Sequence, residues 1–301
     1  VTAPSTHPGG SGATVAFGLA RLGRDVDFLT QLGTDAHGAL MRGHLESAGV
    51  LLSTSSDHAE RTPSARALLD ESGAAHYELD VEWRLDLATA TTPGAHLHLG
   101  SFPAFLGGTP ADVEALLLKA RATSTTSFDP NIRPALMPAQ HLVRDRLEAL
   151  LPWIDVIKAS DEDVAWLYPD LDPVDVIARW LTLGPSLAIV TLGREGSLAA
   201  ASAGLIRVPA QRVEVVDTVG AGDSYMSALL DGLAGADLLG NDRRENLQSA
   251  SVPLVRAVLE RAARAAGITV TRAGANPPDR VELLINAVAE SCRPDSTSEG
   301  K

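Results

Sequence analysis

Short apolar runs alternate with amphipathic helical segments from residue 95 onward, and this alternation constrains the fold most strongly. Strands are expected at residues 95–99, 126–128, 154–158, 187–192, 197–201 and 213–216, and helices at 110–121, 141–150, 161–167, 254–266 and 280–290. Repeated β-then-α units predict an α/β fold, in which a mostly parallel sheet is covered by helices on both faces. Ligands of such folds bind at the carboxyl ends of the strands.

The residues before 95 have a different texture. Apolar residues at helical spacing predict a first helix that begins near Ala13 and stops at Gly23, followed by a strand at 26–32 and a helix at 39–48. Two strand-like runs then flank the turn sequence at 70–73, which predicts a β-hairpin, about 62–80, that projects as a lid. Two polar stretches are expected to be a surface loop and a disordered tail, at residues 241–251 and 294–301.

The charge and the cysteine content exclude several classes of function. The chain has 301 residues, with 25 basic and 38 acidic side chains, so its formal charge is −13. An acidic protein repels nucleic acid and anionic lipid. Cys292 is the single cysteine, which excludes a disulfide framework and a thiolate zinc cluster. With no run of about 18 apolar residues and no signal-peptide core, a cytoplasmic location is expected.

The segment from Asp217 to Asp223 carries the strongest chemical signal. It follows a predicted strand and opens a helix, and Gly220 and Gly222 let its backbone approach a ligand closely. Free N–H groups at a helix start bind anions. A carboxylate beside such a site is unfavourable unless it acts, and a base that accepts a proton from an attacking hydroxyl explains Asp223. The alternative is an ordinary helix start, where Asp is favoured by the helix dipole alone.

This segment resembles the C-terminal D-T-x-G-A-G-D signature of the ribokinase-like (PfkB) carbohydrate kinases. Further segments resemble motifs of that family in the same order: the N-terminal glycine signature (9–16 and 20–23), a G-x-D-x-x-G segment (33–38), the D-P-N-x-R of fructokinase-like and ketodeoxygluconate-kinase-like members (129–133), the magnesium motif (158–163), the T-x-G-x-x-G nucleotide turn (191–196) and the late loop beside the adenine (274–278).

The resemblance implies a ribokinase-like three-layer α/β/α sandwich with a mostly parallel sheet and a small β-sheet lid, formed by residues 1–293. It implies transfer of the ATP γ-phosphoryl group to a sugar hydroxyl, with Mg²⁺ and in some relatives K⁺. Fructose is the first substrate choice, and 2-keto-3-deoxygluconate, ribose or a nucleoside are alternatives. A non-catalytic sugar- or nucleotide-binding member is the alternative of a different class. Pairing through the lids, as in many relatives, would give a homodimer.

The resemblance also assigns roles to residues. Asp223 is the expected base, and the amides of Gly220, Ala221, Gly222 and Asp223 form the expected anion hole. The other assignments are ATP binding by Thr191, Gly193, Gly196 and Asn276, a sugar pocket at Gly9, Gly10, Thr14 and Arg133, Mg²⁺ held through water by Asp163, and a monovalent cation at Asp217. Simpler readings remain open: a flexible end at 9–10, a strand end at 129–130, a surface ion pair at Arg133 and an acidic first helical turn at 161–163.

The chain departs from the family pattern at three places. The family's first strand and its sugar-binding Asp are missing before Gly9, so a truncated sequence is expected. Thr14 replaces an Asn that contacts the sugar, and Ser160 and Asp163 replace the Asn and Glu of the magnesium motif.

One further pattern suggests a metal. His96 and His98 lie two residues apart in a predicted strand, so both rings face one side and would suit a metal ion. Because no third ligand cluster lies nearby in the sequence, simple alternation along a strand is the favoured interpretation.

Overall fold

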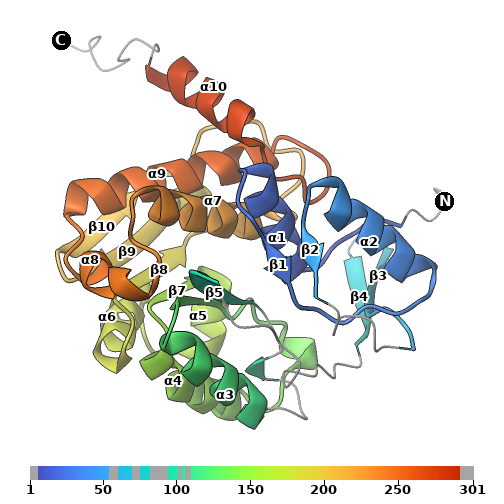
Figure 1. The fold of residues 1–301 in the computed structure, drawn as a ribbon, viewed down its shortest axis with the longest axis horizontal. Coiled ribbons are helices and arrows are strands. Elements are labelled where there is room, and N and C mark those ends of the chain that lie inside the picture. Colours follow the sequence, from blue (N-terminus) through green and yellow to red (C-terminus); the bar gives the residue numbers. More distant parts are fainter. Residues whose placement is uncertain are drawn as a thin grey trace.

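A six-stranded mixed sheet forms the centre of the computed structural model, which describes residues 6–53, 60–69, 75–81, 94–100, 104–105 and 110–291 (Figure 1). Its strand order is β10 (Gly204–Val208), β9 (Ser197–Ala201), β8 (Leu187–Thr191), β7 (Val156–Ser160), β6 (Thr125–Asp129) and β5 (His96–Gly100). Strands β5 to β8 are parallel, and β9 and β10 are antiparallel additions. The predicted α/β architecture is confirmed.

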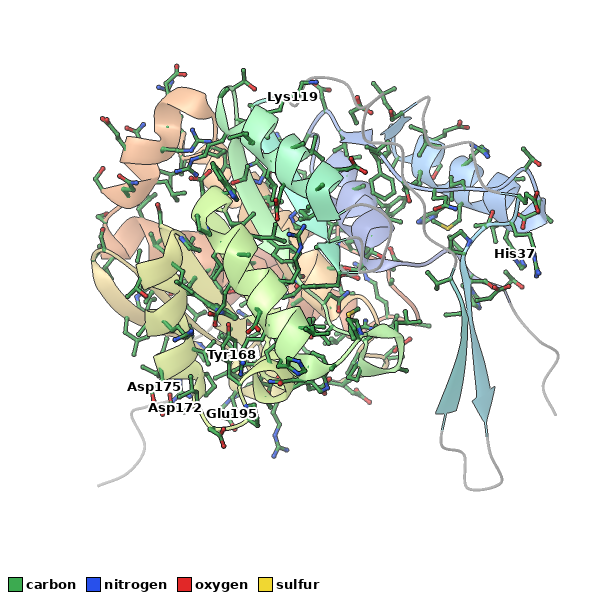
Figure 2. The ribbon with its side chains drawn as sticks, turned by 90° about the horizontal axis from the view of Figure 1, so that it is seen from below. His37, Lys119, Tyr168, Asp172, Asp175 and Glu195 are labelled. Carbon is green, nitrogen blue, oxygen red and sulfur yellow. The ribbon has the colours of Figure 1, made fainter. Side chains whose placement is uncertain are left out.

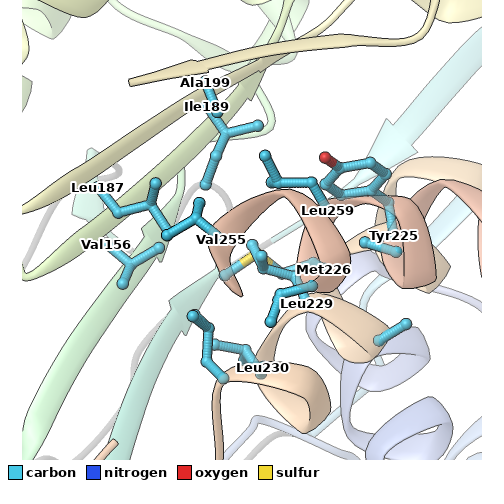
Figure 3. Close-up of a cluster of buried hydrophobic side chains, with 14 of the residues drawn as sticks. Val156, Leu187, Ile189, Ala199, Tyr225, Met226, Leu229, Leu230, Val255 and Leu259 are labelled. Carbon is cyan, nitrogen blue, oxygen red and sulfur yellow. The ribbon is translucent and has the colours of Figure 1, made fainter. Parts of the chain in front are cut away.

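Alternation along the strands divides the core into two layers. Val156, Leu187 and Ile189 face one side of the sheet, and their neighbours Ile157, Ala188 and Val190 face the other. The first face is covered by α1 (Ser11–Arg21), α7 (Ala221–Gly235) and α9 (Val252–Thr269), and Figure 3 shows buried side chains of α7 and α9 packed against the sheet. The second is covered by α3 (Pro110–Arg121), α4 (Gln140–Leu150), α5 (Asp161–Leu167) and α6 (Pro173–Leu183). The result is a three-layer sandwich.

A smaller part of the chain lies beside this sandwich. Strand β1 (Asp27–Phe28) pairs in parallel with β2 (Leu51–Leu52), and α2 (Ala36–Ser47) lies between them in the sequence. The predicted hairpin is present, since β3 (Ser64–Leu69) pairs antiparallel with β4 (Ala75–Asp80), and Figure 2 shows it projecting from the body. Asp35 fixes its base: its carboxylate accepts hydrogen bonds from the Thr62 hydroxyl at 2.6 Å and the Thr62 N–H at 3.0 Å.

Several local predictions were wrong. Of residues 26–32, only Asp27–Phe28 is a strand. Residues 213–216 form no strand, because the N–H groups of Val216 and Asp217 donate to the Val270 carbonyl at the end of α9. Residues 241–251 contain a 3-10 turn, η7 (Asn241–Arg243), and the short helix α8 (Arg244–Gln248) in place of a loop.

The C-terminal part of the described chain is a helix. The last described helix, α10 (Arg280–Ser291), extends beyond the body in Figure 1. The expected tail at 294–301, Cys292 and the turn of the hairpin lie outside the described residues. In the part of the chain that the structure describes, no helix is both long and apolar enough to cross a bilayer.

Candidate active site

A cleft of about 3260 Å³ opens where the carboxyl ends of the parallel strands meet the starts of α1 and α7. Its lining includes Gly9 and Gly10, the segment after β6, the turn after β8 and residues 217–223. The lining also reaches Gly94, Ala95 and Ala234 at the opposite end of the sheet, so only part of this volume lies at the helix starts.

The start of α7 is shaped to bind an anion. Gly220 is its N-cap, with φ +77°, and a Cβ built there would lie 2.6 Å from the Ala275 Cβ, so no other residue fits without displacing the loop at 275. The Ala221 N–H donates to the Thr218 carbonyl at 3.2 Å. Among the described residues, no acceptor meets the N–H groups of Gly222 and Asp223. These two donors, at the positive end of a 15-residue helix, remain for a ligand.

Asp223 lies in the first turn of this helix and accepts a 2.6 Å hydrogen bond from the Ser11 hydroxyl of α1. Burial raises the pKa of Asp223 to about 6, and the negative charge of Asp129 adds to that rise. The Ser11 hydrogen bond and the positive charges of Lys158 and Arg133 act in the opposite direction. The carboxyl is therefore mostly ionised at neutral pH. Its pKa is also close enough to neutral pH for it to take up and release a proton.

A buried ion pair lies beneath the helix start. Lys158 Nζ, from the middle of β7, is 2.8 Å from Asp129 Oδ2, at the end of β6, and their side chains are 5% and 1% exposed. Burial lowers the pKa of Lys158, but Asp129, with help from Asp223 and Asp163, raises it further than burial lowers it, so the lysine is charged. The motif at 129–133 does not predict this pair, because Lys158 lies 29 residues further along the chain.

Asp163, the expected magnesium residue, caps helix α5. Its Oδ2 accepts from the Ser160 N–H at 2.9 Å, while the Ser160 hydroxyl accepts from the Asp163 N–H at 3.1 Å. Its Oδ1 accepts from the Ile132 N–H at 2.7 Å, which holds the loop after β6. Burial raises the pKa of this carboxyl. Asp163 thus has a helix-capping role, which goes beyond the simpler interpretation of 161–163 as an acidic first helical turn.

Arg133 is exposed on the loop that Asp163 holds. Its Nη1 donates to the Asn131 side chain at 2.8 Å and to the Ile132 carbonyl at 2.9 Å. It lines the cleft, and its charge reaches Asp223.

Three of the four residues expected to bind ATP line the cleft, and the fourth lies outside it. Thr191, Gly193 and Gly196 line the cleft, and Gly196 has φ +97° with the Val208 carbonyl 2.0 Å from any Cβ placed there. Asn276 is exposed and outside the lining, where its Oδ1 accepts from Arg21 at 2.8 Å. Asp217 accepts from the Val219 N–H at 3.0 Å and the Gly274 N–H at 2.8 Å, which lower its pKa and join the turn to the loop at 274.

The expected sugar side includes one residue that the sequence analysis missed. Gly9 and Gly10 line the cleft, with open space around a Cβ built at either. Thr14 is buried, and its hydroxyl donates to the Gly10 carbonyl at 3.1 Å rather than into the cleft. Ser11 carries the hydroxyl that reaches Asp223, and its place between Gly10 and Gly12 at a helix start was the available signal.

The two strand histidines form a polar cluster with β6. His96 Nε2 and His98 Nδ1 lie 2.7 and 2.9 Å from the Ser127 hydroxyl, and burial lowers the pKa of both rings to about 3. No group of three His, Cys, Asp or Glu residues able to hold a metal ion occurs among the described residues.

A three-layer fold whose cleft joins a helix-start anion site to a buried carboxylate is the arrangement expected of a kinase of small molecules. The profile of the pfkB family carbohydrate kinase matches residues 1–281. Fructokinases of Klebsiella pneumoniae and Escherichia coli are 36% and 32% identical, covering 75% and 92% of this chain and 77% and 90% of their own. The solved fructokinase of Xylella fastidiosa with bound ATP superimposes with a TM-score of 0.80 at 25% identity, over 94% of this chain and 91% of that one.

The chain belongs to the pfkB family of carbohydrate kinases. It is a sugar kinase with the ribokinase-like sandwich that the sequence motifs indicated, and the expectations of family, fold class and enzyme class are confirmed.

Proposed function

We propose that this sugar kinase transfers the γ-phosphoryl group of ATP to a hydroxyl of fructose, with Asp223 as the base. The observation that carries the proposal is the position of Asp223, a carboxylate with a pKa of about 6 that lines a cleft beside two unpaired helix-start N–H groups. Fructose is chosen because the relatives named above are fructokinases. In addition, residues 129–133 have the D-P-N-x-R pattern of fructokinase-like members.

The reaction forms one bond and breaks another. The sugar oxygen bonds to the γ-phosphorus as the bond from that phosphorus to the bridging oxygen of ADP breaks, and the hydroxyl proton passes to Asp223. The N–H groups of Gly222 and Asp223 stabilise the charge on the transferred group, and Arg133 adds a cation at the cleft edge. Thr191, Gly193 and Gly196 are the proposed nucleotide contacts, and Gly9 and Gly10 the proposed sugar contacts.

A divalent metal fits this site only through water and phosphate. Mg²⁺ usually binds through one or two carboxylates, waters and substrate phosphates, so it needs no cage of side chains. Both oxygens of Asp163 already accept backbone N–H groups, so Asp163 would hold Mg²⁺ through a water, and the metal would supply charge neutralisation on ATP. The oxygens of Asp217 likewise accept hydrogen bonds from the N–H groups of Val219 and Gly274. Asp217 would therefore position the backbone around a K⁺ site rather than enclose the ion with both oxygens.

Two further expectations belong to the same proposal. One is a cytoplasmic location. The other, implied by the family resemblance, is a homodimer paired through the β3–β4 hairpins. Sedimentation of the protein with and without the hairpin tests this pairing. A change from dimer to monomer supports it, and an unchanged oligomeric state rejects it.

Coupled measurement of ADP release tests the function. The protein is assayed with ATP, Mg²⁺ and K⁺ on fructose, 2-keto-3-deoxygluconate, ribose and a nucleoside, with a sugar-free reaction as the control. The highest kcat/KM is expected for fructose. A higher value for another sugar reassigns the substrate, and ADP release with none of them favours the non-catalytic sugar- or nucleotide-binding alternative.

A further inference from the structure

We propose that Lys158 is a positioning residue for Asp223: its ammonium, held by Asp129 beneath Gly222, supports the first turn of α7 and places a buried positive charge against the base. The inference rests on the proposed function of Asp223 and extends it to two residues of the sheet.

The pairing of β6 with β7 brings the two charges together. Ser127 pairs with Val156 and Phe128 with Ile157, so the next positions, Asp129 at the end of β6 and Lys158 in the middle of β7, are neighbours. Phe128 and Ile157 point into the layer of α3 to α6, so by alternation Asp129 and Lys158 point to the α7 side. The 2.8 Å contact between Nζ and Oδ2 is thus fixed by backbone geometry on both strands.

The ammonium lies close to Gly222 at the start of α7. A Cβ built on Gly222 would lie 3.2 Å from Lys158 Nζ, so any side chain at 222 would press on the ammonium. Gly222 has a negative φ, so left-handed geometry is not what favours glycine there. Space for the ammonium gives a physical reason for glycine at this position.

Among the described residues, the ion pair leaves one carboxylate oxygen without a hydrogen bond, and Lys158 is its member that lines the cleft. Asp129 Oδ1 is buried without a hydrogen-bond partner in the described part of the chain. A buried carboxylate with one unsatisfied oxygen is costly and is rarely retained for stability alone.

The charged and polar groups that face Asp223 come from four elements. They are Ser11 from α1, Asp129 from β6, Arg133 from the loop after β6 and Lys158 from β7. Asp129 raises the pKa of Asp223, while Lys158 and Arg133 lower it. The two members of the ion pair therefore act on the base with opposite sign.

This opposition gives a test that a purely structural role would not pass. The acid limb of kcat/KM against pH is measured for Lys158→Met, Asp129→Asn and the double variant. A nearby opposite charge typically moves a carboxyl pKa by about 1–3 units, so Lys158→Met should move the acid limb upward by about one unit or more. Asp129→Asn should move it downward, and the double variant should lie between the two.

Controls separate charge from folding. Lys158→Arg keeps the charge and should keep the acid limb within the wild-type range, although its larger head crowds Gly222. The double variant removes both buried charges, a change that proteins often tolerate, so it remains usable if a single variant fails to fold. Wild-type acid limbs in all three variants, or shifts of the same sign in both single variants, would overturn the proposal.

A readout without turnover distinguishes this inference from the proposed function. The pKa of Asp223 is followed by NMR titration of its carboxyl carbon in the same variants, with Asp223→Asn identifying the signal. If the wild type phosphorylates no sugar but the titration shifts with opposite sign, the proposed function fails and the coupling stands. If the wild type is active and the titration does not shift, the coupling fails alone.

Discussion

Replacement of Ser11 by Ala removes the hydroxyl that donates to Asp223 at 2.6 Å. Because this bond stabilises the ionised carboxylate, its loss raises the pKa of Asp223 above the present value of about 6. The proposed base acts in its ionised form, so the acid limb of the pH profile should move upward.

The magnitude follows from the strength of the bond. A hydrogen bond to a charged group contributes about 1.5–3 kcal/mol, and one pKa unit corresponds to about 1.36 kcal/mol. The acid limb of Ser11→Ala is therefore expected about 1–2 units above that of the wild type. At pH 7 the ionised fraction, and with it kcat/KM, falls by roughly 2- to 10-fold, and most of the loss is recovered above about pH 9.

The assay is kcat/KM from ADP release between about pH 5 and pH 10, with Ser11→Thr as the matched control that keeps a hydroxyl. Thermal unfolding of both variants shows whether the fold is intact. An unchanged acid limb in a folded Ser11→Ala protein, or a loss of activity that is equal at every pH, would refute the role assigned to this bond.

The remaining predictions concern the helix start and the α7–α9 interface. Gly220→Ala should lower stability by about 1–2 kcal/mol and raise the KM for ATP, because φ is +77° and the Ala275 Cβ is 2.6 Å from the added carbon; Gly43→Ala, in open space on α2, is the control and should stabilise by about 0.5–1 kcal/mol. Equal Tm values for the two variants would contradict this. Asp231→Asn should lower stability by about 3 kcal/mol, since the buried carboxylate binds Arg24 at 2.7 Å and Arg261 at 2.5 Å. In the control Asp237→Asn, loss of the exposed pair with Arg243 should cost at most about 1 kcal/mol in urea unfolding, and similar losses in both variants would show that burial does not set the cost.

The parallel half of the fold could be predicted because its strands are short, apolar and followed by periodic helices. Helices 110–121 and 161–167 have the expected bounds, and strands β6, β7 and β8 differ from prediction by one or two residues at their ends. Where long-range partners decide, the prediction failed. Residues 213–216 have a strand-like composition, yet their backbone is held by the end of α9.

The candidate site was predictable where a sequence motif fixes the local backbone geometry. Gly220, with its positive φ and its contact to Ala275, and Asp223 at the helix start lie as the motif suggested. Side chains whose partners are distant in sequence were not predictable. Asn276 is taken by Arg21, 255 residues away, and the Ser11 contact to Asp223 spans 212 residues.

Asp129 and Lys158 show the same limit at shorter range. Each lies in a recognised motif, but only the pairing of β6 with β7 brings one opposite the other. The sequence shows both charged residues, but it does not show the register of β6 against β7 that places them side by side.

The base assignment is tested most directly by Asp223→Asn, which keeps the size of the side chain and can still accept from Ser11. A positioned general base contributes about 10²–10⁴ in rate. Single-turnover phosphorylation of the best sugar substrate is therefore expected to slow by about that factor, with the Kd for ATP nearly unchanged. Phosphoryl transfer at the wild-type rate by this variant would contradict the account.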